Sequence, residues 1–547
     1  MPSVKDFWHT QLARLSRRDL FRNSGLLAAA GLLRPGAISA TPIPSLQIGA
    51  EIYRSIGVRP VINARGTITV LTGSQTLPEV KAAMDAASRN FVQMDELMDA
   101  VGKRLAELTG AEWGMVTTGA AGSLMLATCA CIAGGDPDKL ELMPYQASIP
   151  GMKSEVIIPR NSRNVYDHSI RSVGVRIMEP ESMNQLEAMV GPQTAMIMLL
   201  TAARDYTTGP MSVDEVAAVA KHNAVPLLVD AAAEELRVPN PHLSRGADLV
   251  CYSGGKCIRG PQCAGLLLGR RDLVQAAWVN SAPHHSICRA LKAGKEEIVG
   301  MLAAVEMWFK RDHAAEEKVW ESWLQEIAER LKLIDGITTD IVAARGIDNR
   351  TPHLRITWDP AKIDLTEDEL EQKLFQGEPR IAVGGAGSFL PFPPDTGTSV
   401  GITPYQMMPG EAKIVADRLS EELSKAPKLG WRARPAEPVG NLTGQWDVML
   451  TYVCGTGDCR LVLEQQGNSV VGTHYGMAAN REMVGSIDGS NVLLRSSYTR
   501  HGARLNFTFR GTVEDDTIRG SVLLGEYGNA TFVAKRHQYA PPGGRGR

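Results

Sequence analysis

The sequence predicts an α/β fold: a mainly parallel sheet, then a small α/β lobe, then a C-terminal all-β domain. Between about residues 50 and 320, continuous apolar runs alternate with helical patterns. Strands that are buried on both faces of a parallel sheet have this character. From 444 to 535, short runs of alternating polarity are separated by glycines, which is typical of antiparallel sheets. A proline-rich stretch at 428–439 separates the two patterns.

Residues 1–40 predict an export signal. A basic region with Arg17 and Arg18 precedes an apolar stretch at 24–33 and small residues at Ser39 and Ala40. The adjacent arginines resemble the twin-arginine motif. We therefore expect a cleaved signal peptide and export to the periplasm by the twin-arginine machinery, with the protein already folded. The alternative is a basic amphipathic helix at the start of a cytosolic protein.

Residues 41–320 are expected to form the large domain with the parallel sheet. Its strands are predicted at 156–158, 195–200, 226–229 and 264–268. Helical segments lie between these runs, which predicts βαβ units. In such units the carboxyl ends of the strands meet at one edge of the sheet, where ligands bind. Polar residues that follow these strands are therefore the first candidates for a site.

Residues 321–428 predict a smaller α/β lobe, with helices at 316–332 and 411–424 and a strand at 354–358. A linker is expected at 429–440 and a disordered tail at 537–547. The all-β domain, 441–536, is expected to be an up-and-down barrel or a sandwich of six to eight strands. The runs that predict its strands are 446–450, 460–464, 470–472, 492–494, 505–509, 520–524 and 530–533.

Composition narrows the class of protein. Hydrophobic residues make up 44% and charged residues 22% of the chain, as in ordinary globular proteins. With 58 basic and 60 acidic residues the net charge is −2, so we expect no nucleic-acid partner. No apolar run reaches the roughly 18–20 residues that span a bilayer, so we expect no membrane segment in the mature form. Eight cysteines are too few for a disulfide scaffold.

Asp230 lies at the carboxyl end of the strand predicted at 226–229, and a later short strand ends in Ser253-Gly254-Gly255-Lys256. Pyridoxal phosphate (PLP) requires such a pair. A lysine forms the Schiff base, and a buried carboxylate keeps the pyridine nitrogen protonated, so that the ring can take up carbanion charge. Either residue alone also fits a structural aspartate or a surface lysine. Their order and spacing favour the cofactor pair, Asp230 and Lys256.

The cofactor phosphate requires hydrogen-bond donors. The segment 117–123, which reads TTGAAGS, follows the short strand 114–116 and opens an apolar helix at 124–132. Small residues at a helix N-terminus expose backbone N–H groups to an anion. We therefore expect Gly119 and Ala120 at the phosphate, with the Ser253 hydroxyl as a further donor. The alternative is a tight helix start that needs glycine for its conformation alone.

The lysine segment also carries a family resemblance. Together, 253–256 and 260–265 resemble the corresponding segment of the selenocysteine synthase (L-seryl-tRNA selenium transferase) family, and 61–67, 163–171 and 292–297 are also similar. The resemblance covers about 55–425 but not the leader or the β domain. Gly-Gly-Lys is closer to the D-glucosaminate-6-phosphate ammonia-lyase branch than to the transferases, which usually have an acidic residue before the lysine. Arg259, where the family tends to have a small residue, departs from both branches at the substrate entrance.

The resemblance implies an aspartate-aminotransferase-like (fold type I) PLP-dependent transferase fold, with PLP as cofactor. It implies that Lys256 forms the Schiff base and removes the Cα proton of the substrate. One of Tyr166 and His168 is expected over the cofactor ring, and we favour His168. The implied catalytic residues are thus Lys256 and Asp230. The implied cofactor-binding residues are Lys256, Asp230, Gly119, Ala120, Ser253 and His168.

An arginine is expected to bind a substrate carboxylate through two hydrogen bonds. Arg380, in the small lobe, is the best candidate, while Arg355 lies in a strand-like run that also fits a surface position. His284 and His285 fall where family members line the mouth of the active site. Two adjacent histidines without a third ligand do not make a metal site, so no metal is expected.

Three groups of cysteines have an expected role. Cys129 and Cys131 lie on the apolar helix and are expected in the core. Cys257 adjoins the catalytic lysine, and a small buried hydrophobe is favoured over a catalytic thiol. Cys454 and Cys459 bracket a hairpin turn in an exported domain, and facing strand positions are compatible with a disulfide. We therefore expect a Cys454–Cys459 bridge.

Together these features predict a PLP-dependent lyase or transferase that acts on a small amino acid or amino-sugar acid, by elimination of the ammonia-lyase type or a related replacement. One alternative is a selenium transferase, but the leader, the net charge and the lack of a basic tRNA-binding region argue against it. The other is a catalytically dead binding protein, against which the presence of both Lys256 and Asp230 speaks. The resemblance also implies a homodimer or a higher homo-oligomer.

Overall fold

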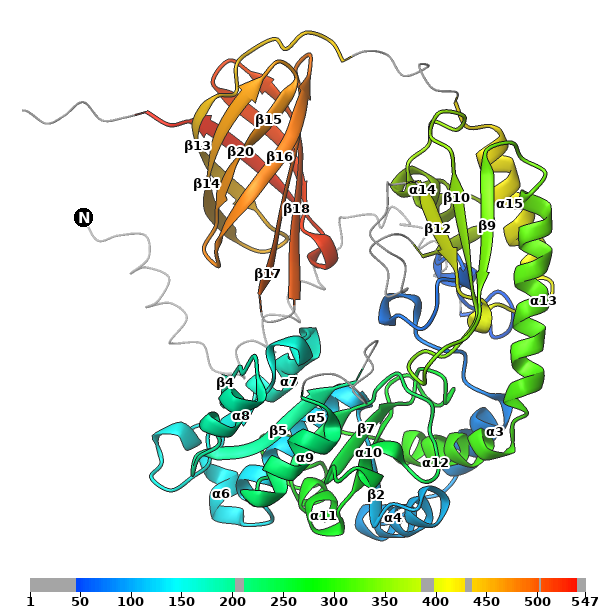
Figure 1. Cartoon of the computed structure of the whole chain (residues 1–547), viewed down its shortest axis with the longest axis vertical. Coiled ribbons are helices and arrows are strands. Elements are labelled where there is room, and N and C mark those ends of the chain that lie inside the picture. Colours follow the sequence, from blue (N-terminus) through cyan, green and yellow to red (C-terminus); the bar gives the residue numbers. More distant parts are fainter. Residues whose placement is uncertain (1–45, 202–210, 385–397, 428–434, 501–502, 539–547) are drawn as a thin grey trace, which may run out of the picture. The chain divides into compact units, whose positions relative to one another are not determined.

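The computed structural model describes residues 46–201, 211–384, 398–427, 435–500 and 503–538 (Figure 1). The expected signal peptide at 1–40 lies outside these residues, as do parts of the expected linker and tail. Within the first 60 residues, the described part of the chain contains one short 3-10 helix, η1 (Arg54–Ile56).

The large domain is built on a seven-stranded sheet with the order β2-β8-β7-β6-β5-β3-β4. The five neighbours from β7 to β4 pair in parallel, whereas β8 is antiparallel to both β2 and β7. A mainly parallel sheet is thus confirmed. The strands are β2 (Trp113–Thr117), β3 (Glu155–Ile157), β4 (Arg176–Met178), β5 (Thr194–Leu200), β6 (Leu227–Asp230), β7 (Leu249–Ser253) and β8 (Gly265–Gly269).

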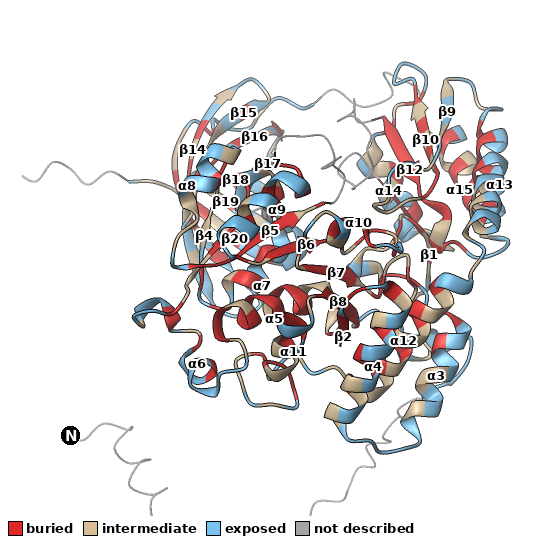
Figure 2. Cartoon of the chain, turned by 60° about the horizontal axis from the view of Figure 1, so that its bottom comes forward, coloured by how far each residue is buried: buried red, intermediate tan, exposed pale blue. Residues whose placement is uncertain are grey.

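Helices cover this sheet, and α5 is the most deeply buried of them. It is apolar on nearly every side because it lies between the sheet and α11, and Figure 2 shows it in red beside β7 and β8. The helices of the large domain are α3 (Pro78–Ser88), α4 (Met94–Thr109), α5 (Gly119–Ala133), α6 (Pro137–Leu142), α7 (His168–Arg171), α8 (Met183–Met189), α9 (Val213–His222), α10 (Pro241–Ser244), α11 (Arg271–Val279) and α12 (Lys295–Lys310).

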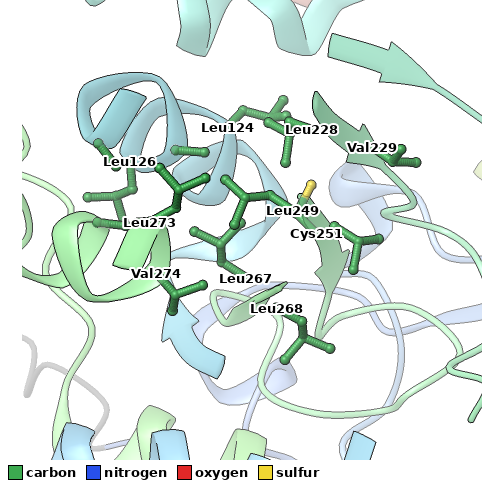
Figure 3. Packing of buried hydrophobic residues seen from close by; sticks show 14 of the residues in the cluster. Leu124, Leu126, Leu228, Val229, Leu249, Cys251, Leu267, Leu268, Leu273 and Val274 are labelled. Atoms are coloured by element: carbon green, nitrogen blue, oxygen red, sulfur yellow. The ribbon is translucent and has the colours of Figure 1, made fainter. Parts of the chain in front are cut away.

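The core under α5 follows from the register of the strands. Leu228 of β6 lies beside Leu249 of β7, so both side chains point to the same face of the sheet. Figure 3 shows these side chains with Leu267 of β8, close to Leu124 of α5 and Leu273 of α11. All except Leu273, which is 8% exposed, are fully buried. This packing fixes the position of α5, and with it the N-terminus of the helix, relative to the strand ends.

The small lobe has its own hydrophobic core and two small sheets. One sheet has the order β12-β10-β9, and the other pairs β1 with β11 in parallel. The expected domain division differs here, because residues 61–64, assigned to the 41–320 domain, pack in the core of the small lobe. The elements are β1 (Val61–Ala64), α13 (His313–Leu331), β9 (Ile337–Val342), β10 (His353–Trp358), α14 (Glu367–Gln376), β11 (Arg380–Val383), β12 (Ser399–Ile402) and α15 (Glu411–Ser424).

The C-terminal domain is a closed eight-stranded barrel in which each strand pairs with its neighbours in sequence, and β20 closes onto β13. This decides between the barrel and the sandwich in favour of the barrel. One strand, β16, has no counterpart among the predicted runs. The strands are β13 (Gly444–Thr451), β14 (Thr456–Gln466), β15 (Ser469–Tyr475), β16 (Asn480–Asp488), β17 (Asn491–Arg500), β18 (Ala503–Glu514), β19 (Thr517–Leu523) and β20 (Asn529–Arg536).

The expected Cys454–Cys459 disulfide is wrong for this structure, because both cysteines are free thiols. The hairpin is tighter than the sequence indicated: Thr451 pairs with Thr456, and the Tyr452 N–H bonds to the Gly455 carbonyl. Cys454 therefore falls inside the turn, whereas Cys459 lies on β14 opposite Val448. The two cysteines do not occupy facing strand positions.

Among the described residues, no helix combines the length and the apolar character needed to cross a membrane. Nor do three or more His, Cys, Asp or Glu side chains of the described residues come together in a group that could hold a metal ion.

Candidate active site

The register of three strands brings the predicted cofactor-binding segments to one edge of the large sheet. Gly265, the first residue of β8, pairs with Thr117 on one side and with Ser253 on the other. Because β8 runs opposite to β2 and β7, its first residue lies beside the last residues of both. The loops that begin at Thr118 and at Gly254 therefore leave the sheet from the same edge.

Asp230 ends β6 two strands away and pairs with Cys251 of β7. Its carboxylate is 2% exposed and accepts hydrogen bonds from the Ala232 N–H at 3.1 Å and the Cys251 thiol at 3.6 Å. Burial raises the pKa of Asp230, while the nearby Lys256 ammonium, the Ala232 N–H and the Cys251 thiol oppose this rise. A buried carboxylate of this kind is stabilised by a cationic partner.

Lys256 lies at the end of a tightly packed turn after β7. The Gly254 N–H donates to the Ala264 carbonyl at 2.8 Å, and the Gly255 carbonyl accepts from the Ser74 N–H at 2.8 Å. A Cβ on Gly254 would lie 2.7 Å from the Ala264 carbonyl oxygen, and one on Gly255 would lie 3.0 Å from Cα of Gln262. The Gly-Gly pair is therefore required for packing, and it leaves the lysine side chain half-buried.

The start of α5 forms a cradle of backbone groups. Thr118 is the N-cap, yet its hydroxyl makes no hydrogen bond in the described structure, although it is buried. Gly119 has a positive φ of 71°, which glycine adopts without strain. A Cβ on Gly265 would lie 2.7 Å from the Gly119 carbonyl oxygen and 2.8 Å from the Ala120 nitrogen. The helix start therefore approaches β8 as closely as it does only because residue 265 is glycine.

Two hydroxyls hold this helix start in place. Thr117 Oγ1 donates to the Gly119 carbonyl at 3.0 Å and lies 2.7 Å from Oγ of Ser123. The Ser123 hydroxyl in turn lies 3.1 Å from the Leu266 carbonyl oxygen of β8. Both side chains are buried. The N–H groups of the first turn of α5 thus stay aimed at the sheet edge, where they can bind an anion.

A buried ion cluster supports the segment with Tyr166 and His168. Asp167 is fully buried and pairs with Arg163 and with Arg171, the latter at 3.0 Å. Tyr166 and His168 themselves are exposed. Burial and the charge of Asp230 both raise the pKa of Tyr166, so its hydroxyl lies within electrostatic range of that carboxylate. Both side chains are exposed, so the position of His168 over a cofactor ring, with Tyr166 as the alternative, stays a prediction.

The predicted substrate arginine is engaged elsewhere. The Arg380 guanidinium lies 4.7 Å from the ring centre of Phe375 and donates to the Phe375 carbonyl at 3.0 Å, so it stabilises the junction between α14 and β11. Arg355 pairs with Asp340 at 2.9 Å, as a surface residue does. His284 lies 3.2 Å from Asp95, which also accepts from Trp278 at 2.9 Å. The geometry therefore adds no support to Arg380 as a substrate ligand.

A buried polar network near Asp230 was not predicted from the sequence. Glu234, only 2% exposed, accepts from the Thr201 hydroxyl and lies 2.6 Å from Nε2 of His242. The backbone of this segment also binds the small lobe, since Glu235 N–H donates to the Ile347 carbonyl at 2.9 Å. In the sequence, adjacent glutamates look like a solvated surface. The one signal was that Glu234 follows Asp230 by four residues after a buried strand.

A second cluster that the sequence analysis did not identify links the segment after β1 to other parts of the small lobe. The Tyr405 hydroxyl lies 2.6 Å from Oγ1 of Thr67 and accepts from the Thr67 N–H at 3.1 Å. Burial raises the pKa of Tyr405 to about 12, so it stays neutral. Arg65 lies 3.9 Å from Glu371 of α14. Burial raises the pKa of Glu371 to about 7, and Arg65 opposes this rise.

These residues fit PLP. The orphaned Thr118 hydroxyl and the first-turn N–H groups of α5 match a phosphate, and the buried carboxylate of Asp230 matches a protonated pyridine nitrogen. Lys256 lies close enough to Asp230 to act on its ionisation. A mainly parallel sheet that presents these three elements at one edge defines the class: a fold-type I PLP-dependent enzyme.

Comparison with known proteins identifies the family. The model of the L-seryl-tRNA selenium transferase family matches residues 181–334. D-glucosaminate-6-phosphate ammonia lyase from Salmonella typhimurium is 34% identical over 341 residues, which is 60% of this chain and 88% of that protein. A solved structure of a D-glucosaminate-6-phosphate ammonia-lyase has a TM-score of 0.59 at 30% identity and covers 68% of this chain and 99% of that one. The chain therefore belongs to the PLP-dependent family that includes this ammonia lyase and the selenocysteine synthases.

Other relatives in the family carry different names. A 5'-C-glycyluridine monooxygenase-decarboxylase from Streptomyces is 32% identical over 346 residues, 60% of this chain and 83% of that protein. An L-seryl-tRNA(Sec) selenium transferase from Moorella thermoacetica is 26% identical over 354 residues, 56% of this chain and 70% of that protein. The cofactor and the fold are thus shared, while family membership alone does not select one reaction.

We predict that Gly265→Ala weakens PLP binding. The added Cβ would collide with Gly119 and Ala120, so the helix start must move away from the sheet edge. We expect the dissociation constant for PLP, measured by absorbance titration of the cofactor-free protein, to rise at least about tenfold, or ~1.4 kcal/mol. Gly135→Ala is the matched control, since its Cβ would have no atom within 4 Å. Unchanged affinity in Gly265→Ala would contradict the proposed phosphate cradle.

Glu371 should make stability depend on pH. Its pKa in the folded protein, about 7, lies above the ordinary 4.5, so its contribution is present below about pH 4.5 and is lost as pH rises through 7. The full rise in pKa corresponds to ~3 kcal/mol, but the Glu371 side chain is 25% exposed and water screens it, so we expect wild type to lose about 1–2 kcal/mol of unfolding free energy relative to Glu371→Gln between pH 4.5 and 8. Urea unfolding at both pH values measures this difference, with Glu321→Gln on the exposed face of α13 as control. Parallel stability curves for wild type and Glu371→Gln would rule out the raised pKa.

Proposed function

We propose that the protein is a PLP-dependent lyase that eliminates ammonia, or a related leaving group, from an amino-sugar acid or amino acid. The observation that carries this proposal is the convergence of Lys256, the buried Asp230 and the N-terminus of α5 at one sheet edge. Identity of 34% to an ammonia lyase, over 88% of its length, supports elimination. The glycine before Lys256, as in that branch, supports it further.

Each residue has a distinct role in this proposal. Lys256 would hold PLP through its side-chain amine, and the freed amine would take the proton from the substrate Cα and donate it to the group that leaves from Cβ; hydrolysis of the remaining imine by water would then release ammonia and the keto acid. Asp230 holds the proton on the ring nitrogen. Gly119, Ala120 and Ser253 bind the phosphate, and Tyr166 or His168 covers the ring. Bound PLP supplies an electron sink that stabilises negative charge at the substrate Cα.

A selenium transferase is the second candidate, since relatives with that name match 56% of this chain. It requires a large tRNA substrate. The net charge of −2 gives no excess of positive charge for binding a polyanion. The first candidate is therefore favoured, with a small amino-acid-like substrate.

Loss of Lys256 tests the catalytic assignment. We expect Lys256→Ala to fold and to lose the near-visible absorbance of lysine-bound PLP, with kcat at least about a hundredfold lower because no base remains at Cα. Asp230→Ala should bind PLP more weakly and lose most activity, because the ring nitrogen loses its partner. Lys81→Ala, an exposed substitution on α3, is the control. Full turnover in either active-site variant would remove its assigned role.

The substrate class is tested with purified holoenzyme and a panel of D-glucosaminate 6-phosphate, D-glucosaminate and the common amino acids. Elimination releases ammonia and a keto acid from at least one of them, and both products are measured. Oxygen uptake and CO₂ release are recorded in parallel. Ammonia-free turnover with oxygen uptake would instead support chemistry of the monooxygenase-decarboxylase kind.

We also propose a homodimer as the minimal unit. PLP sites at a sheet edge are often completed by a second subunit, and homo-oligomers of this size most often have C₂ symmetry. Light scattering of the active holoenzyme measures the mass directly, and an active monomer at assay concentration would contradict this assembly.

We propose further that residues 1–40 direct export of the folded, cofactor-loaded enzyme to the periplasm. The support is the Arg17-Arg18 pair ahead of the apolar stretch 24–33. Arg17→Lys with Arg18→Lys should leave active, PLP-loaded enzyme in the cytosol, while the unchanged sequence is found in the periplasm. Cell fractionation with activity assays measures both. Export of the double variant at the normal level would exclude the twin-arginine route.

A further inference from the structure

The interior of the C-terminal barrel changes character along its axis. Most of it is filled with apolar side chains such as Trp446, Phe509 and Phe532, all nearly or fully buried. Toward the end formed by the turns 452–455 and 476–479, the inward positions become polar. These positions hold Cys459, His474, Arg481, Ser496 and Tyr498 on β14 to β17.

Arg481 is the one charged side chain among these inward positions. It alternates with the buried Met483 and Ile487 along β16, so its side chain points into the barrel, and the residue is only 6% exposed. Within the described residues, no carboxylate forms an ion pair with it, and none contributes to its ionisation. A buried guanidinium without a counter-ion is costly, because burial removes the water that would stabilise its charge.

The neighbours of Arg481 do not neutralise it. Its Nη1 lies 3.3 Å from Nδ1 and 3.5 Å from Nε2 of His474. Burial, with the charge of Arg481, lowers the pKa of His474 to about 4, so the imidazole stays uncharged near neutral pH. Nδ1 of His474 is also occupied by the Ser496 hydroxyl at 2.9 Å. The Nε of Arg481 is buried and has no hydrogen-bond partner among the residues that the structure describes.

Aromatic rings flank the guanidinium. Its carbon lies 4.4 Å from the ring centre of Phe507 and 5.7 Å from that of Tyr498. These cation–π contacts stabilise the charge in part, by about 0.5–2 kcal/mol each. An aromatic ring offers no anionic oxygen, so the guanidinium N–H donors are left without an acceptor of matching charge.

We propose that this end of the barrel is a binding site for a small oxyanion, a carboxylate or a phosphate group, held by Arg481. The guanidinium edge presents parallel N–H donors that match two oxygens of such a group. Tyr498 adds a hydroxyl donor on the neighbouring strand. Eight-stranded barrels have an interior wide enough for one small ligand.

The rim of this end of the barrel is partly exposed to solvent. Cys459 and Tyr498 are half-buried, and Tyr452 is 37% exposed. The Cys459 thiol lies in the electrostatic field of Arg481, which opposes the burial effect that raises the pKa of Cys459 to about 12. The reactivity of the Cys459 thiol therefore reports whether an oxyanion is bound to Arg481. A bound oxyanion covers the thiol and neutralises the positive charge that favours the reactive thiolate.

The experiment measures how fast N-ethylmaleimide labels Cys459 in the full-length holoenzyme, with the peptide resolved by mass spectrometry. Bound PLP blocks the phosphate cradle of the large domain. The probes are inorganic phosphate and sodium acetate, each compared with sodium chloride at equal ionic strength. We expect at least one probe to slow labelling of Cys459 threefold or more, in a saturable manner. Which of the two acts distinguishes a phosphate from a carboxylate ligand.

Variants decide whether Arg481 is responsible. In Arg481→Gln the protection of Cys459 should disappear, whereas Arg519→Gln, an exposed arginine on the outer face of β19, should keep it. Should Arg481→Gln fail to fold, Arg481→Lys preserves the charge but not the paired donors, and its half-saturating concentration should rise about tenfold or more. Absence of protection by both probes in wild type would overturn the proposal. Equal protection in wild type and either Arg481 variant would do so as well.

Discussion

The catalytic body depends on one steric constraint: the absence of a side chain at residue 265. Because β8 enters the sheet at this glycine, antiparallel to both neighbours, the start of α5 packs against it and the lysine turn leaves the sheet from the same edge. Helix α5 is held from behind by the leucine core shared by β6, β7 and β8. The position of the anion-binding helix start is thus set by close packing on both sides, and Asp230 lies two strands away on the same rigid sheet.

Much of the large domain could be predicted from the sequence, because its signals are local. Strands that are buried on both faces of the sheet are continuous apolar runs, so 194–200, 227–230 and 265–269 were located to within a residue or two. Asp230, Gly119 and Lys256 follow such strands directly, and strand ends converge by topology alone. The sequence did not predict the roles of residues whose partners are distant along the chain. Glu234 looks like a surface residue until Thr201 and His242 are placed against it.

In the barrel, too, the sequence did not predict the features that depend on partners elsewhere in the chain. β16 was missed because its inward positions are Arg481, Met483, Gly485 and Ile487, which do not read as an apolar alternation. The strand that departs from the pattern is also the one that carries a buried charge, so the failure marks an unusual chemical environment. The Cys454–Cys459 pairing failed for a different reason, since the register of a hairpin depends on where its turn closes.

The pairing of β1 with β11 has a consequence for how the chain folds as it is made. Residues 61–64 emerge from the ribosome early, but their partner, 380–383, follows more than three hundred residues later. The core of the small lobe therefore cannot close until nearly all of the catalytic body has been synthesised. In the barrel, by contrast, seven of the eight strand pairs join neighbours in sequence. Folding of the two regions is thus governed by very different loop-closure entropies, with the enzyme body as the slower of the two.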